Sequence, residues 1–116
     1  MARRWRLKDP RGKEVIFNDR AWFHSIDGHP EIAPYEKKVK EAVKSPDRIL
    51  LSKNDNNAEI YERRSNIRSG MFKNSYTFVV AESIITGTRT YNKIKTAYLT
   101  FEQKEGDVRW QKEIKN

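Results

Sequence analysis

The feature that most constrains the fold is an amphipathic segment bounded by prolines in the first half of the chain. Its apolar residues recur at steps of three and four, which is the period of a helix with one buried stripe. These apolar residues are Ile32, Tyr35, Val39, Ala42 and Val43. Pro34 suits the first turn, where a missing N–H is harmless, and Pro46 disfavours helical geometry at Ser45. The sequence therefore predicts a helix that ends at Ser45.

A β-hairpin is predicted before this helix. Residues 3–8 alternate basic and apolar side chains, and residues 14–17 follow after a turn. The turn, DPRG at positions 9–12, has proline second and glycine fourth, as a type I turn takes them. A short apolar helix comes next and is expected to end at Asp27 and Gly28, where glycine permits a left-handed cap. The residues that can cap its start are Asn18 and Asp19.

The rest of the chain is predicted to form a meander of antiparallel strands. The predicted strands are residues 48–52, 58–64, 76–85 and 93–101. The third of these is dense in aromatic and β-branched residues on both faces, as a central strand should be. The tail from residue 102 carries Val108, Trp110 and Ile114, and its pattern allows either an edge strand or a short helix. We therefore predict one α+β domain, residues 1–116, with the N-terminal hairpin and helices packed on one face of a small antiparallel sheet.

Side-chain alternation along two of these strands indicates which residues share a face. In the strand 58–64, one face carries Glu59, Tyr61 and Arg63. Such alternation most often marks the solvent face of an outer strand. In the last strand, one face carries Ile94, Thr96, Tyr98 and Thr100. The hydroxyl groups on this second face make it a candidate functional surface.

The composition is strongly basic, with 24 Lys and Arg against 16 Asp and Glu and a formal charge of +8. Such an excess favours a polyanionic partner, most often nucleic acid. The chain has no cysteine, which excludes disulfides and thiolate metal sites, and its two histidines make a poor zinc set. No metal or cofactor is therefore expected. No run approaches the roughly 18 apolar residues of a membrane span, and no apolar signal core follows the N-terminus, so we expect a cytoplasmic protein without membrane contact.

Several short motifs occur in an order and spacing that resemble a known group of nucleases. They are HPEI at 29–32, SPDRI at 45–49, a tyrosine-bearing strand with Arg63, FVV at 78–80 and KTAY at 95–98. Together they resemble the phage-associated branch of the barnase, EndoU, colicin D and RelE-like nuclease superfamily. The resemblance implies a small sheet with helices packed against it, whose open face binds RNA and cleaves it without a metal.

The cleavage that the resemblance implies turns the ribose 2′-hydroxyl onto the adjacent phosphate. It needs a base for the 2′ proton, an acid for the leaving 5′ oxygen and cations for the charge on the phosphate. His29 or His24 can act as base or acid, and Glu59 is an alternative base. The catalytic residues implied by position are His29, Arg48, Arg63, Thr96 and Tyr98. The two arginines would hold the phosphate as bidentate donors. The basic residues expected to contact nucleic acid are Arg64, Arg68, Lys73 and Lys95.

Other interpretations of the same residues stay open. His29 can cap the entry of the helix, and Arg48 can pair with a nearby acid, Asp47 or Glu31. A second function is therefore a basic module that binds RNA, DNA or an acidic protein without chemistry, and a third is a phage-encoded inhibitor or adaptor. A nuclease of this kind would be a toxin or a phage enzyme, with an immunity or inhibitor protein as a further partner. Convergence of the predicted catalytic residues in one cleft would favour the enzyme, and their dispersal would favour the binding module.

Overall fold

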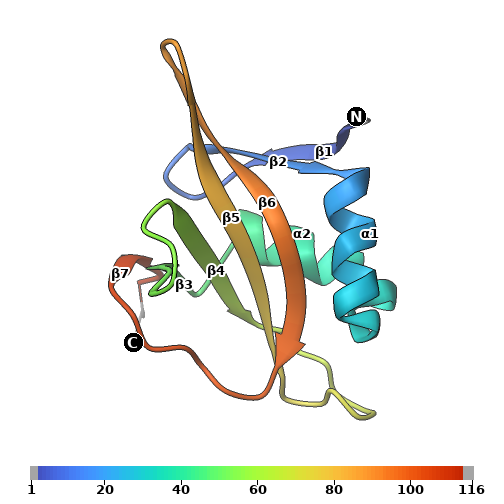
Figure 1. Ribbon diagram of the computed structural model, residues 1–116. Helices are drawn as coiled ribbons and strands as arrows, with labels where there is room; N and C mark the ends of the chain where they lie inside the picture. The colour runs from blue at the N-terminus through green and yellow to red at the C-terminus, as the bar shows by residue number, and fades with distance from the viewer. Residues whose placement is uncertain (1–2, 114–116) are drawn as a thin grey trace.

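A computed structural model describes residues 3–113 of the chain and shows an α+β fold, as the sequence predicts (Figure 1). The strands are β1 (Arg3–Lys8), β2 (Glu14–Asn18), β3 (Arg48–Leu51), β4 (Ala58–Arg64), β5 (Tyr76–Thr86), β6 (Arg89–Thr100) and β7 (Val108–Gln111). The helices are α1 (Asp19–Gly28), the 3-10 helix η1 (Pro30–Tyr35) and α2 (Glu36–Lys44). One sheet contains the seven strands in the order β1-β2-β6-β5-β4-β3-β7. Its neighbours are antiparallel except β2 and β6, whose parallel pairing the sequence did not predict.

The two faces of the sheet have different cover. The helices pack on one face, here called the helix face, whose buried residues include Ile49, Tyr61, Val79 and Ala97. The opposite face, here called the open face, carries a smaller apolar cluster of Leu50, Ile60 and Phe78, with Tyr98 packed against it. The main core therefore lies between the sheet and the helices, which leaves the open face for function.

The N-terminal hairpin and the first helix form as predicted, but the hairpin extends the sheet beside β6 and does not pack on one face of it with the helices. Gly12 has a φ of 83°, and its N–H donates to the Asp9 carbonyl at 2.9 Å to close the turn. The Asn18 side chain accepts a hydrogen bond from the backbone N–H of Ala21 at 2.9 Å and caps α1. The predicted left-handed cap at Gly28 is wrong, because α1 includes Gly28 and ends on His29, whose φ is −139°.

The amphipathic segment forms two helical pieces, where the sequence predicts one helix. In η1, the N–H of Ile32 donates to the carbonyl of His29, three residues earlier, at 3.0 Å. Pro34 has no N–H with which to continue an α-helical ladder, so the α-helix begins only at Glu36. The helix then ends before Ser45, as predicted. The predicted apolar stripe is correct, since the buried residues of η1 and α2 are Ile32, Val39, Ala42 and Val43.

A β-bulge in β6 moves one predicted residue to the other face. The register shifts between Val80 and Ala81 of β5, whose partners in β6 are Thr96 and Ile94. Lys95 is the extra residue, and a bulge of this kind interrupts the alternation of side chains. Ile94 is therefore buried in the main core and does not share a face with Thr96.

The tail returns to the sheet as an edge strand, which resolves the open choice between strand and helix. Residues 101–107, here called the strap, leave the end of β6 and lead to β7, which pairs with β3 (Figure 1). Ile114 lies outside the described residues. Within residues 3–113, no helix is long and apolar enough to cross a membrane.

Candidate nucleic-acid interface

Four side chains form a continuous row across the open face. The strand register pairs Arg48 with Glu62, Glu62 with Phe78, and Phe78 with Tyr98. These residues come in turn from β3, β4, β5 and β6. The β3 end of the row is charged, whereas the β6 end is aromatic, with ring centroids 5.6 Å apart.

The strap covers the middle of this row. Arg48 donates from Nε and Nη2 to the two carboxylate oxygens of Glu62, each at 2.9 Å. Its Nη2 also donates to the Lys104 carbonyl at 2.9 Å, and Gln103 Nε2 donates to Glu62 at 3.1 Å. The Lys104 ammonium lies over the two aromatic rings of the row, 5.7 and 5.5 Å from their centroids. The Arg48 guanidinium is therefore already committed to Glu62 and to the strap.

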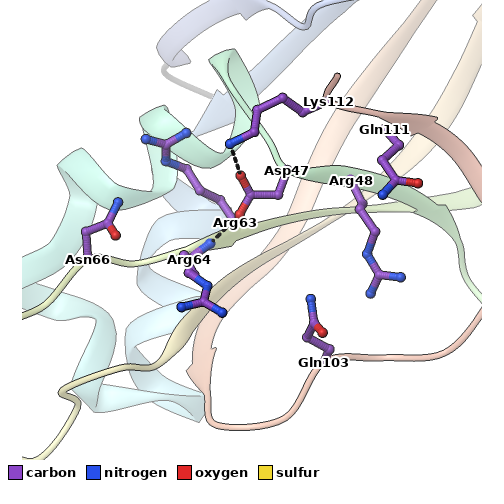
Figure 2. A pocket seen from close by; sticks show the side chains of 8 residues that line it. All are labelled: Asp47, Arg48, Arg63, Arg64, Asn66, Gln103, Gln111 and Lys112. Atoms are coloured by element: carbon purple, nitrogen blue, oxygen red, sulfur yellow. Dashed lines mark hydrogen bonds and ion pairs between the residues drawn. The ribbon is translucent and has the colours of Figure 1, made fainter. Parts of the chain in front are cut away.

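A hollow of about 340 Å³ lies at the β3 end of the row (Figure 2). Its lining residues are Asp47, Arg48, Arg63, Arg64, Asn66, Gln103, Gln111 and Lys112. Asp47 is the one carboxylate among them. It accepts the Lys112 ammonium at 3.2 Å and the backbone N–H of Arg64 at 2.8 Å. Because Glu62 already neutralises Arg48, three cations remain against this one carboxylate, which makes the hollow suited to an anion.

The arginines of the hollow differ in how free their guanidinium groups are. Arg63 points toward α2 and donates to the Ser45 carbonyl at 2.6 Å (Figure 2). Its Nε lies 4.0 Å from Glu41 and, among the described residues, is buried without a hydrogen-bond partner. The Arg64 guanidinium lies 5.9 Å from the Tyr76 ring and forms no ion pair within the described part of the chain. Arg64 is thus the arginine of the hollow that is freest to bind an added phosphate.

His29 stacks on Tyr98 at the opposite end of the row. The ring centroids are 4.8 Å apart and the planes are 25° from parallel. His29 Nδ1 lies 3.5 Å from a carboxylate oxygen of Glu31, and the imidazole is 42% exposed. Three strand spacings of about 4.8 Å separate β6 from β3, so Tyr98 lies roughly 14 Å from Arg48. The structure thus brings His29 to Tyr98 and Arg48 to Arg64, but it does not join these two groups in one cleft.

The other residues predicted to act on nucleic acid are dispersed. Thr96 is half-buried on the open face, opposite Val80. Arg68 and Lys73 are exposed on the loop between β4 and β5. Lys95 is the bulged residue of β6, and its ammonium lies 3.9 Å from Asp55. None of these four lines the hollow.

Glu59, the alternative base, belongs to a buried polar network on the helix face. Arg11 donates to its two oxygens at 2.8 and 2.7 Å, and Asn92 donates to it at 3.0 Å. Arg11 also binds Asp9, which accepts the Tyr61 hydroxyl at 2.8 Å, so the network ties the hairpin turn to β4. Burial alone would raise the pKa of Glu59, but the bonds from Arg11 and Asn92 outweigh it and hold the pKa at about 2. The solvent-face interpretation is wrong, because Glu59 is 7% exposed, and so low a pKa makes it a weak base.

Several residues of the hollow were not indicated by the sequence patterns. They are Asp47, Asn66, Gln103, Gln111 and Lys112. Asp47 is adjacent to Arg48 in the SPDRI motif, which was the available signal. Gln111 reaches the hollow only because β7 pairs with β3, a contact between distant parts of the chain. Within residues 3–113, no group of three or more His, Asp or Glu side chains is placed to hold a metal ion.

Comparisons with protein-family models, with curated proteins and with solved structures found no match for this chain. The fold and the hollow therefore define a basic α+β domain with one open sheet face.

Proposed function

We propose that this domain binds single-stranded RNA across its open face, with a backbone phosphate in the hollow. The observation that carries the proposal is the cation excess of the hollow, which is lined by Arg48, Arg63, Arg64 and Lys112 and by one carboxylate, Asp47. Arg48 and Lys112 are paired with carboxylates, and Arg63 is held by a carbonyl. Arg64 remains to supply the bidentate donors that a phosphate prefers. The dispersal of the predicted catalytic residues favours binding over cleavage.

Aromatic rings on the same face support single-stranded RNA as the partner. Tyr76 is partly exposed on the open face, and its ring lies 5.9 Å from the Arg64 guanidinium. The Tyr98 ring is already stacked by His29 and lies beside the Lys104 ammonium. Bases of a single strand stack on such rings while neighbouring cations hold the phosphates. A double helix would hide its bases from these rings, which is why the alternation of rings and cations favours a single strand.

The test is fluorescence anisotropy of a short labelled single-stranded RNA at several salt concentrations. We expect affinity to fall steeply between roughly 50 and 200 mM salt, because binding releases counterions. Arg64→Gln should weaken binding about tenfold and lower the salt slope by about 1. The charge-matched control is Lys37→Gln, on the exposed side of α2 and away from the open face, which should change neither quantity. Equal losses in the two variants would overturn the assignment of phosphate to the hollow.

A second candidate function is RNA cleavage without a metal, as the nuclease resemblance implies. The observation that favours it is the stacking of His29 on Tyr98, with the Lys104 ammonium 5.5 Å from the same ring. An imidazole at this position can serve as the base or the acid, and the ammonium can offset charge on a phosphate. In the reaction, the 2′ oxygen bonds to phosphorus as the bond to the 5′ oxygen breaks. The base takes the 2′ proton and the acid protonates the leaving oxygen.

Cleavage is tested by incubating the protein with mixed RNA in EDTA and analysing the fragment ends. Discrete fragments ending in 2′,3′-cyclic phosphate, lost in His29→Ala and in Tyr98→Phe, would support the second candidate. Intact RNA that is nevertheless bound would leave binding as the function.

A further inference from the structure

A second cavity, of about 330 Å³, lies where β2 and β6 separate and α1 begins. The two strands pair only at Val15 with Asn92 and at Ile16 with Lys93, after which the chain turns into α1. We call this space the fork cavity. It lies at the β6 side of the sheet, whereas the hollow lies at β3 and β4, and the two share no lining residue.

The cations of the fork cavity are less neutralised than those of the hollow. Arg20, Lys93 and Lys95 line it, and Glu82 is its one carboxylate. Glu82 lies directly opposite Lys93 in the sheet, yet the two form no ion pair. Within residues 3–113, Arg20 and Lys93 have no carboxylate partner, and Lys95 has only Asp55 at 3.9 Å. A concave site with unpaired cations attracts an anion more strongly than one whose cations are already paired.

The remaining lining residues suit a planar group. Ala21 and Ile94 line the cavity but are only 9% and 1% exposed, so the apolar wall that they offer is narrow. The exposed imidazole of His24 adds a flat ring at its rim. The volume falls in the range of small-ligand pockets. A ring against this wall would leave Glu82 as an acceptor for an amino group on that ring.

We propose that the fork cavity binds a nucleotide whose base carries an amino group. Arg20, Lys93 and Lys95 hold its phosphate, and the base lies against the exposed ring of His24 beside Ala21 and donates its amino group to Glu82. The same chemistry is met by a free mononucleotide and by the phosphorylated 5′ end of an RNA strand. The site goes beyond the proposed function, because it requires neither the hollow nor a long strand.

The test is a calorimetric titration of the full chain with adenosine 5′-monophosphate, adenosine and uridine 5′-monophosphate at low salt. We expect adenosine monophosphate to bind at least fivefold more tightly than either of the others. Lys93→Gln and Arg20→Gln should each weaken it at least fivefold, whereas Lys37→Gln, on the exposed side of α2, should leave it unchanged. Glu82→Gln should reduce the preference for adenine over uracil. Circular dichroism confirms folding, and the substitution of Arg20, which is exposed on α1, leaves the side chains of the sheet unchanged.

Two outcomes would overturn the proposal. The first is equal binding of adenosine and adenosine monophosphate, which would mean that the cations do not hold the phosphate. The second is equal weakening by Lys93→Gln and Arg64→Gln, which would mean that the nucleotide binds in the hollow or without a defined site. Binding of a free mononucleotide is distinguished from binding of an RNA 5′ end with a short RNA that bears either a 5′-phosphate or a 5′-hydroxyl. If the protein prefers the phosphorylated RNA and loses this preference in Lys93→Gln, the site binds RNA ends. If it binds the mononucleotide tightly but shows no preference between the two RNAs, the site binds free nucleotides.

Discussion

The Arg48 guanidinium and the Glu62 carboxylate form two parallel hydrogen bonds of 2.9 Å on the open face, and the Glu62 side chain is 1% exposed. Removing one partner of such a pair leaves the other charge buried and unpaired. We expect Arg48→Ala to lower the free energy of unfolding by about 3–5 kcal/mol, measured by urea denaturation. Arg48 therefore stabilises the fold, and a loss of RNA binding in Arg48→Ala would not show that Arg48 contacts RNA.

The control for this prediction is Lys112→Ala, in the same hollow. Its side chain is 59% exposed, its ammonium lies 3.2 Å from Asp47, and an exposed pair contributes at most about 1 kcal/mol. Arg48→Ala and Lys112→Ala with the same urea midpoint would show that the Arg48 pair does not stabilise the fold.

The buried network of Glu59 gives a prediction for acid stability. The pKa of Glu59 is about 2 in the folded chain against an ordinary value of 4.5. A depressed folded pKa contributes stability above the unfolded pKa, and that stability is lost as the pH falls from 4.5 toward 2. We expect a loss on the order of 2–3 kcal/mol over this window, measured by urea denaturation at successive pH values.

Glu59→Gln should flatten this acid limb, although it also lowers stability at neutral pH by weakening the bond to Arg11. The matched control is Glu105→Gln, which should leave the limb unchanged because the Glu105 side chain is 94% exposed. An acid limb of the same size in Glu59→Gln would contradict the assignment of the effect to this network.

His29→Ala separates binding from cleavage. His29 stacks on Tyr98, roughly three strand spacings from the hollow, so we expect RNA affinity to change less than about twofold. If the protein cleaves RNA, the same variant should abolish fragment formation in EDTA. Affinity and cleavage are measured on one RNA, with His24→Ala as the second histidine variant. A parallel loss of affinity and cleavage in His29→Ala would make His29 a structural residue.

The elements of this fold were largely predictable because their signals are local. The strand Ala58–Arg64 matches its predicted bounds, and the hairpin turn and the helix stop at Ser45 follow from proline and glycine positions. The bulge at Lys95 has no comparable signal, since it depends on how β6 meets β5. The parallel pairing of β2 with β6 likewise depends on packing between distant segments.

The candidate site was less predictable because it depends on which face is covered. The alternation of side chains along β4 correctly places Arg63 on one face and Glu62 and Arg64 on the other. Because both faces of this strand carry polar and apolar residues, the sequence does not show which face the helices cover. Arg63 was therefore predicted to act with Arg48, although it points toward α2 (Figure 2). The strap contacts of Gln103 and Lys104 join residues far apart in sequence, and no local sequence pattern predicts these contacts.

The measurement that tests RNA binding on the open face most directly is a nuclear magnetic resonance titration of the isotopically labelled protein with a short single-stranded RNA. We expect the largest amide shifts around the hollow and the strap, at Arg64, Asn66, Gln103, Lys104 and Lys112, and little change on α2. Shifts confined to the helices or to the β1–β2 hairpin, or no shifts at low salt, would contradict the proposed interface.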